Sequence, residues 1–83
     1  MYHLIYSEKA ARFLRNLDKE PQKQIIYALE RIRIRPEHYL IKLIDKPGYK
    51  LRISHYRLLI DLNQQQLQIL VIEIGHRKNI YKK

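Results

Sequence analysis

The segment from residue 49 to residue 62 constrains the fold of this chain more than any other part of the sequence. Tyr49–Ile53 alternates strictly between apolar and basic residues, which is typical of a strand with one buried face. Ser54 and His55 form a tight break, and Tyr56–Leu62 continues as a second strand. Closing a hairpin at this break predicts four pairs: Ile53 with Tyr56, Arg52 with Arg57, Leu51 with Leu58, and Lys50 with Leu59.

This register divides the hairpin into two chemically different faces, because side chains alternate between the faces of a strand. One face is apolar and is expected to pack against helices; it carries Tyr49, Leu51, Ile53, Tyr56, Leu58 and Ile60. The other face carries Lys50, Arg52 and Arg57, with no acidic residue among them. Like charges that face each other across a sheet destabilise it. Either the two arginines extend into water, or this face binds phosphate, which relieves the repulsion.

The first half of the chain predicts one strand and two amphipathic helices. Tyr2–Tyr6 is short and rich in aromatic and β-branched residues, as strands are. Ser7 is a suitable N-cap for a first helix, whose apolar stripe recurs at helical spacing. Pro21 fits the first turn of a second helix, which ends by Arg35 because Pro36 disfavours helical backbone in the residue before it. The two apolar stripes are Ala10, Phe13, Leu14 and Leu17, then Ile25, Ile26, Leu29 and Ile32.

The second half predicts a sheet. Tyr39–Asp45 is irregular or a short strand, and Lys46–Gly48 is a turn before the hairpin. Leu67–Ile74 is apolar on both faces apart from Gln68 and Glu73, which is expected of a central strand, and Gly75 is expected to end it. The predicted class is α+β in the order β-α-α-β-β-β. A small, mainly antiparallel sheet carries a two-helix hairpin on one face, within a single domain spanning residues 1–83.

Length and composition limit the possible functions. Eighty-three residues are too few for a TIM barrel or a complete dinucleotide-binding fold. The absence of Cys excludes disulfides and thiolate chemistry. No apolar run reaches membrane-span length, and the first residues lack a signal-peptide layout, so a cytoplasmic protein without a membrane partner is expected. The net charge of +9 favours a polyanionic partner, most often nucleic acid.

The chemistry-bearing residues near the C-terminus are His76, Arg77 and Tyr81. They lie beside the cationic hairpin face if the last strand neighbours the hairpin. The acidic residues of this half are scattered and the four histidines lack metal-ligand spacing, so no metal and no small-molecule cofactor are expected. A cleavage reaction would therefore use cations to stabilise developing charge and Tyr, His or Lys to move protons.

Two stretches resemble conserved motifs of the RelE/ParE toxin superfamily. Residues 49–60 are similar to its pattern Y-R-L-R-x-G-x-Y-R-x-x-Y, and residues 74–81 to its ending v-G-H-R-x-x-[IV]-Y. Residues 13–19 resemble the weaker phrase F-L-x-x-L-x-K. The family's turn glycine is Ser54 here, and its strand-end tyrosine is Ile60. The ending favours the RelE branch, whose members are mRNA endonucleases, over the ParE branch, whose members inhibit DNA gyrase.

The resemblance implies a toxin of a type II toxin–antitoxin system that cleaves mRNA in the ribosomal A site. It also implies that the 2′-hydroxyl attacks the adjacent phosphate without a metal. The partners implied are the ribosome with its mRNA and rRNA, and an acidic, RelB-like antitoxin. The site residues implied are Lys50 and Arg52 for activating the 2′-hydroxyl, Arg57 and Arg77 for holding the phosphate, Tyr81 for the substrate base, and His76 as a general acid. The alternatives are a ParE-like gyrase inhibitor and an RNA- or DNA-binding module without catalysis.

Overall fold

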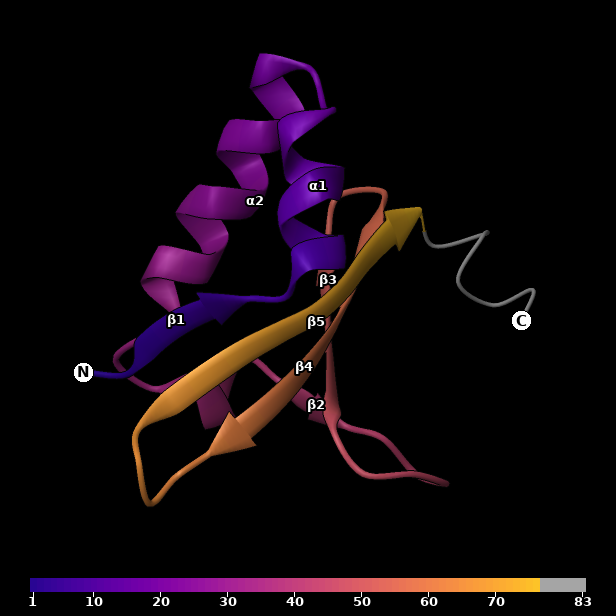
Figure 1. Cartoon of the computed structure of the whole chain (residues 1–83). Helices are drawn as coiled ribbons and strands as arrows, with labels where there is room; N and C mark the ends of the chain where they lie inside the picture. The colour runs from indigo at the N-terminus through magenta and orange to yellow at the C-terminus, as the bar shows by residue number, and fades with distance from the viewer. Residues whose placement is uncertain (77–83) are drawn as a thin grey trace.

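In the computed structural model, which describes residues 1–76, two α-helices pack against a five-stranded mixed sheet (Figure 1). Within these residues the α+β class and the order of helices and strands agree with the prediction, and a further two-residue strand precedes the hairpin. The elements are β1 (His3–Tyr6), α1 (Glu8–Arg15), α2 (Lys19–Arg31), the 3₁₀ turn η1 (Pro36–His38), β2 (Ile41–Lys42), β3 (Tyr49–Ile53), β4 (Tyr56–Asn63) and β5 (Gln68–His76).

The strands lie in the order β1-β5-β4-β3-β2. Strand β5 lies between β1 and β4, so the prediction that it is internal is confirmed. Strand β1 runs parallel to β5, whereas the pairs β5–β4, β4–β3 and β3–β2 are antiparallel. The sheet is therefore mainly antiparallel, as predicted, with its one parallel pair at an edge of the described sheet.

The β3–β4 hairpin has the predicted register at every position. Arg52 pairs with Arg57, and Tyr49 pairs with Ile60 at the far end. The turn fits in two residues because Ser54 adopts a left-handed backbone, with φ of 55°. The loop before the hairpin is closed at Gly48, whose φ of 110° is one that residues with a side chain rarely adopt.

Ser7 connects the sheet to the first helix. Its hydroxyl accepts a hydrogen bond from the Ala10 amide at 3.0 Å, so the predicted N-cap is confirmed. The same hydroxyl donates to the Ile72 carbonyl at 2.6 Å. Helix α1 therefore starts beside β5, at the point where β1 ends (Figure 1).

Helix α2 begins after Asp18 and has Pro21 in its first turn, as predicted. It ends at Arg31, before the limit set by Pro36. No helix in residues 1–76 is long and apolar enough to cross a membrane.

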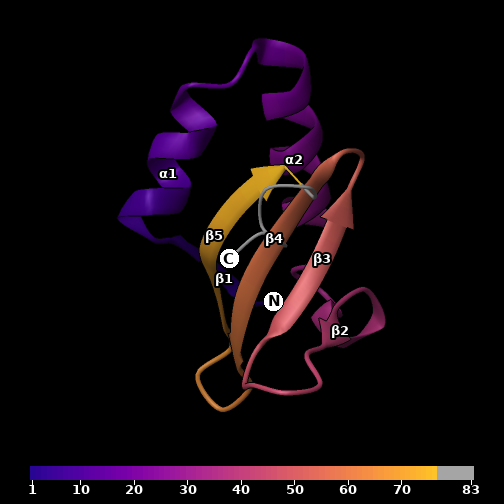
Figure 2. The ribbon, with the colours of Figure 1, turned by 90° about the vertical axis from the view of Figure 1, so that its right-hand side faces the viewer.

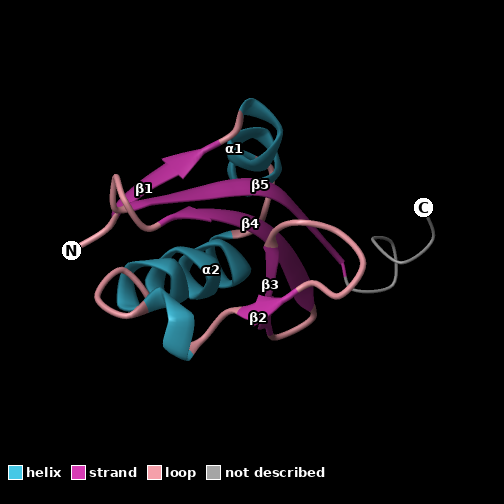
Figure 3. Ribbon diagram, turned by 90° about the horizontal axis from the view of Figure 1, so that it is seen from below, coloured by secondary structure: helices cyan, strands magenta, loops and turns pink. Residues whose placement is uncertain are grey.

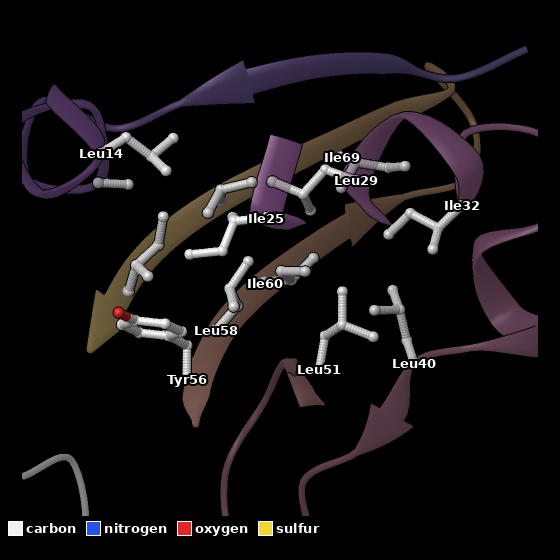
Figure 4. Packing of buried hydrophobic residues seen from close by; sticks show 13 residues of the cluster. Leu14, Ile25, Leu29, Ile32, Leu40, Leu51, Tyr56, Leu58, Ile60 and Ile69 are labelled. Atoms are coloured by element: carbon white, nitrogen blue, oxygen red, sulfur yellow. The ribbon is translucent and has the colours of Figure 1, made fainter. Parts of the chain in front are cut away.

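Both helices contribute to one hydrophobic core against a single face of the sheet (Figures 3 and 4). Ile25 and Leu29 of α2 are fully buried, and Leu58 and Ile60 of β4 lie beneath them (Figure 4). The predicted apolar hairpin face is thus the face that the helices cover. The buried apolar residues are Ala10, Leu14, Ile25, Leu29, Ile32, Leu40, Leu51, Tyr56, Leu58, Ile60, Ile69, Val71 and Ile74.

Strand β5 differs from the prediction in two respects. It continues through Gly75 to His76, because Gly75 pairs with Arg57 inside the sheet rather than ending the strand. A bulge also shifts its register: Leu59 pairs with Glu73, but Ile60 pairs with Val71. Ile72 is the extra residue and is 41% exposed. The run of apolar residues in β5 therefore results from the β-bulge as well as from the internal position of the strand in the sheet.

The N-terminal segment is hydrogen-bonded to the residues that follow α2. Arg33 donates from Nε to the Tyr2 carbonyl at 2.9 Å and forms an ion pair with Glu30 at 2.7 Å. Tyr6 lies close to this group. Burial raises the pKa of the Tyr6 hydroxyl above its usual value, and the charge of Glu30 raises it further, whereas Arg33 lowers it.

Candidate functional site

The face of the sheet opposite the helices carries the predicted cations. Figure 2 shows β3, β4 and β5 side by side with α2 behind them. Arg52 lies directly opposite Arg57, and Arg57 lies opposite Gly75 on the next strand. One row further along, Lys50 lies opposite Leu59, and Leu59 lies opposite Glu73. Two adjacent rows of this face therefore combine three cations, one leucine and one carboxylate.

The three cations differ in their exposure. Arg52 is exposed and Lys50 is half-buried, but Arg57 is only 5% exposed. The interpretation that both arginines extend into water is therefore wrong for Arg57. Burying a guanidinium is costly, because the charge loses its hydration. Arg57 is thus a buried guanidinium that pairs with a second arginine across the hairpin, and a guanidinium is a group suited to binding phosphate.

A hollow of about 700 Å³ opens beside these residues. Its floor is formed by the sheet, with Lys50, Arg57, Leu59 and Glu73. Its wall is the segment 41–46, which contributes Lys42 and Lys46 together with apolar residues and Asp45. The hollow is large enough for one nucleotide and carries more cations than carboxylates. Its chemistry therefore suits a phosphate with an attached sugar or base.

Glu73 belongs to this site, although the sequence alone shows it only as one of several scattered acids. Its carboxylate lies 3.3 Å from the Lys9 ammonium of α1, and its side chain is 21% exposed. Helix α1 runs along the part of β5 that β1 does not cover, which brings Lys9 to this edge (Figure 2). The available signal was the one acidic residue of this strand, which lies between Ile72 and Ile74.

His76 does not join the cationic residues. It pairs with Tyr56, which belongs to the apolar face, so its side chain lies on the helix side of the sheet. Its ring lies 4.9 Å from that of Tyr56 and 6.5 Å from that of Phe13. The expectation that His76 lies beside the cationic face is therefore wrong, and its role as a general acid has no geometric support. Arg77 and Tyr81 lie outside the described residues.

Residues 1–76 contain no cluster of three or more His, Asp or Glu side chains that could hold a metal ion. The described groups able to act on a ligand in the hollow are its ammonium and guanidinium donors and its carboxylates. This set can hold a phosphate, neutralise charge that develops on it, and accept a proton.

Several solved structures resemble this chain in fold. No family model and no curated protein matches the chain. Among solved structures, the isolated Escherichia coli RelE toxin superposes with a TM-score of 0.78 at 27% identity, covering 99% of this chain and 93% of the toxin. A chain of the intact E. coli RelBE toxin–antitoxin complex gives 0.79 at 27%, covering 92% and 96%. A chain of the RelBE2 complex from Mycobacterium tuberculosis gives 0.81 at 20%, covering 92% and 98%.

The fold and the hollow define a small α+β domain with an anion-binding sheet face. The structural neighbours identify it more closely, since they match it over almost its whole length. The chain belongs to the RelE-like superfamily, and its fold is that of the RelE toxins of RelBE toxin–antitoxin systems. The predicted membership is confirmed.

Proposed function

We propose that this chain is the toxin of a type II toxin–antitoxin system and cleaves mRNA in the ribosomal A site. The observation that carries the proposal is the buried Arg57 beside Lys50 in a nucleotide-sized hollow, on a fold shared with the RelE toxins. The hollow supports binding of a phosphate group. The shared fold supports RNA cleavage as the outcome of that binding.

In the proposed reaction, the 2′-hydroxyl of an mRNA nucleotide attacks the adjacent phosphate. Arg57 and Lys50 hold the phosphate and neutralise the charge that grows on its oxygens in the transition state. Arg52, which is exposed and pairs with Arg57 on the neighbouring strand, attracts the adjacent phosphates. Arg77 and Tyr81 keep their predicted roles of holding phosphate and contacting a base. The reaction needs no metal, because the cations provide the electrostatic stabilisation.

The proposal includes a partner and a location. Several structural neighbours are complexes of RelE with RelB. We therefore propose an acidic RelB-like antitoxin for this basic chain, since opposite charge favours association with a net charge of +9. The ribosome is the proposed platform for cleavage, and the cytoplasm is the compartment in which both partners occur.

A translation extract programmed with a defined mRNA tests the reaction. The unchanged chain is expected to produce cuts in phase with codons, and Arg57→Met to lose them. Arg31→Ala removes one exposed charge from α2, away from the hollow, and should cut normally. Full cleavage by an Arg57→Met/Arg77→Ala double variant would contradict the proposal.

The same protein samples distinguish the alternative functions. Inhibition of gyrase supercoiling without mRNA cleavage would select the ParE-like function. Salt-dependent RNA or DNA binding without any product would select a non-catalytic module, with log K falling as log salt rises.

A further inference from the structure

We infer that Glu73 is the general base of the proposed cleavage reaction and accepts the proton of the attacking 2′-hydroxyl. This inference rests on the proposed function. It differs from what the RelE/ParE resemblance implies, which is that Lys50 and Arg52 activate the 2′-hydroxyl.

The position of Glu73 follows from the strand register. Lys50, Leu59 and Glu73 form one row across β3, β4 and β5. Adjacent strands are about 4.8 Å apart, so the backbones of Lys50 and Glu73 are roughly 10 Å apart with Leu59 between them. All three side chains line the same hollow. A ribose lying over the half-buried Leu59 therefore has a cation on one side and a carboxylate on the other.

Arg57 places the phosphate relative to Glu73. Arg57 pairs with Gly75, two residues along β5 from Glu73, so the two side chains are diagonal neighbours on one face. Diagonal neighbours have Cα atoms about 7–8 Å apart, within reach of long side chains. A phosphate held by Arg57 and Lys50 leaves the attached ribose beside the Glu73 carboxylate.

The base must have a free lone pair at neutral pH. Arg52 and Arg57 have none, because guanidinium groups are not deprotonated in proteins. Lys50 is an ammonium in its ordinary state and also has none. His76 lies on the other face of the sheet. Among the described lining residues, the carboxylates are Asp45, exposed in the 41–46 segment, and Glu73 in the sheet.

Lys9 of α1 forms an ion pair with the Glu73 carboxylate at 3.3 Å. Lys9 does not line the hollow that Glu73 lines. Among residues 1–76, the charged groups that contact Glu73 or line the hollow with it are Lys9 of α1, Arg57 of β4, Lys50 of β3, and Lys42, Asp45 and Lys46 of the segment 41–46.

In the proposed cleavage step, the Glu73 carboxylate takes the 2′-hydroxyl proton, and the freed oxygen forms a bond to phosphorus. The bond from phosphorus to the 5′-oxygen of the next nucleotide breaks, and that oxygen takes the electron pair and a proton from water. The products are a 2′,3′-cyclic phosphate and a 5′-hydroxyl. Glu73 then releases its proton to the hydroxide that remains.

Single-turnover cleavage of mRNA on purified ribosomes tests the assignment. Glu73→Gln keeps the shape of the side chain but cannot accept the proton at neutral pH, so cleavage is expected to slow by about 100-fold or more. The unchanged chain is expected to slow as the medium is acidified, and Glu73→Gln to lose this dependence. Cleavage by Glu73→Gln at the unchanged rate, with the same pH dependence, would overturn the inference.

Two matched variants separate catalysis from structure. Lys9→Met breaks the ion pair but keeps the carboxylate, so cleavage should stay within a few-fold of the unchanged chain; a loss as large as that of Glu73→Gln would show that only the ion pair matters. Lys50→Arg keeps a cation that cannot be deprotonated. Its loss should be smaller than that of Glu73→Gln, with the pH dependence retained. A larger loss would assign the base to Lys50 and overturn the inference.

These measurements also test the role of Glu73 and the proposed function separately. Cleavage by the unchanged chain together with normal cleavage by Glu73→Gln would refute the base and leave the proposed function standing. A folded, unchanged chain that cuts no ribosome-bound mRNA would refute both.

Discussion

The two faces of the strands β3, β4 and β5 have the same backbone but opposite chemistry. On one face, Leu58 and Ile60 are completely buried under the helices. On the other, Arg57 is buried almost as deeply, yet it lies opposite another arginine. Burial of leucine and isoleucine contributes to stability through the hydrophobic effect. Burial of an arginine does not contribute in this way, because the charge loses its hydration.

This comparison shows how a chain of 83 residues accommodates both a core and a site. The period of two in a strand places neighbouring residues on opposite faces, so stability and function are interleaved along one segment. Residues that are adjacent in sequence should therefore give opposite phenotypes. Substitutions on the two faces test this separation.

Leu58→Ala should lower the free energy of unfolding by about 2–5 kcal/mol, because it leaves a cavity at the centre of the core. Denaturant unfolding followed by circular dichroism measures the change. A loss well below 1 kcal/mol would mean that the helix-facing side is not the main source of stability. The proposed division of stability and function between the two faces of the sheet would then be wrong.

Arg57→Met, one residue away, should reduce mRNA cleavage by about 100-fold or more, which is the effect of losing a strong electrostatic contact to the transition state. Its free energy of unfolding should change by less than about 1 kcal/mol, because replacing a buried ion with an apolar group of similar volume is often neutral. Cleavage and unfolding are measured on one preparation. An unfolded Arg57→Met protein would make Arg57 a structural residue.

Ser7→Ala should lower the free energy of unfolding by about 1 kcal/mol, because the Ala10 amide loses its acceptor. Thermal and denaturant unfolding measure the loss. Cleavage by the folded protein should be unchanged, since Ser7 does not line the hollow. An effect on cleavage without an effect on stability would show that the start of α1 belongs to the site.

Tyr6 provides a small pH effect on the stability of the helix-facing side. Because burial raises its pKa, the folded chain holds the hydroxyl proton more tightly than the unfolded chain does. This contribution is fully present below pH about 10, and it is lost as the pH rises through the raised value. Tyr6→Phe should therefore lose less stability on alkalinisation than the unchanged chain, as followed by unfolding curves. Identical curves would contradict the prediction.

The parts of the fold that sequence predicts are those set by local rules. The hairpin register follows from a two-residue turn and strict alternation, so all four predicted pairs, from Lys50 with Leu59 to Ile53 with Tyr56, are observed. The cap at Ser7 follows equally from neighbouring residues. The cationic cluster of Lys50, Arg52 and Arg57 was found for the same reason.

The parts that sequence does not predict depend on pairing between distant segments. The parallel pairing of β1 with β5 joins residues about 65 positions apart, and alternation within either strand does not specify it. The bulge at Ile72 depends on how β5 meets β4. These pairings put Glu73 on the cationic face and His76 on the other. The acid and the histidine were therefore misjudged, whereas the hairpin cations were not.

Mapping of mRNA 5′ ends after induction in a bacterial host tests whether the cationic face is an RNA-cleavage site. The unchanged chain is predicted to create new ends inside translated reading frames, in phase with codons, and Arg57→Met to create none at equal protein level. New ends that arise equally with Arg57→Met, or no new ends with the unchanged chain, would contradict the account.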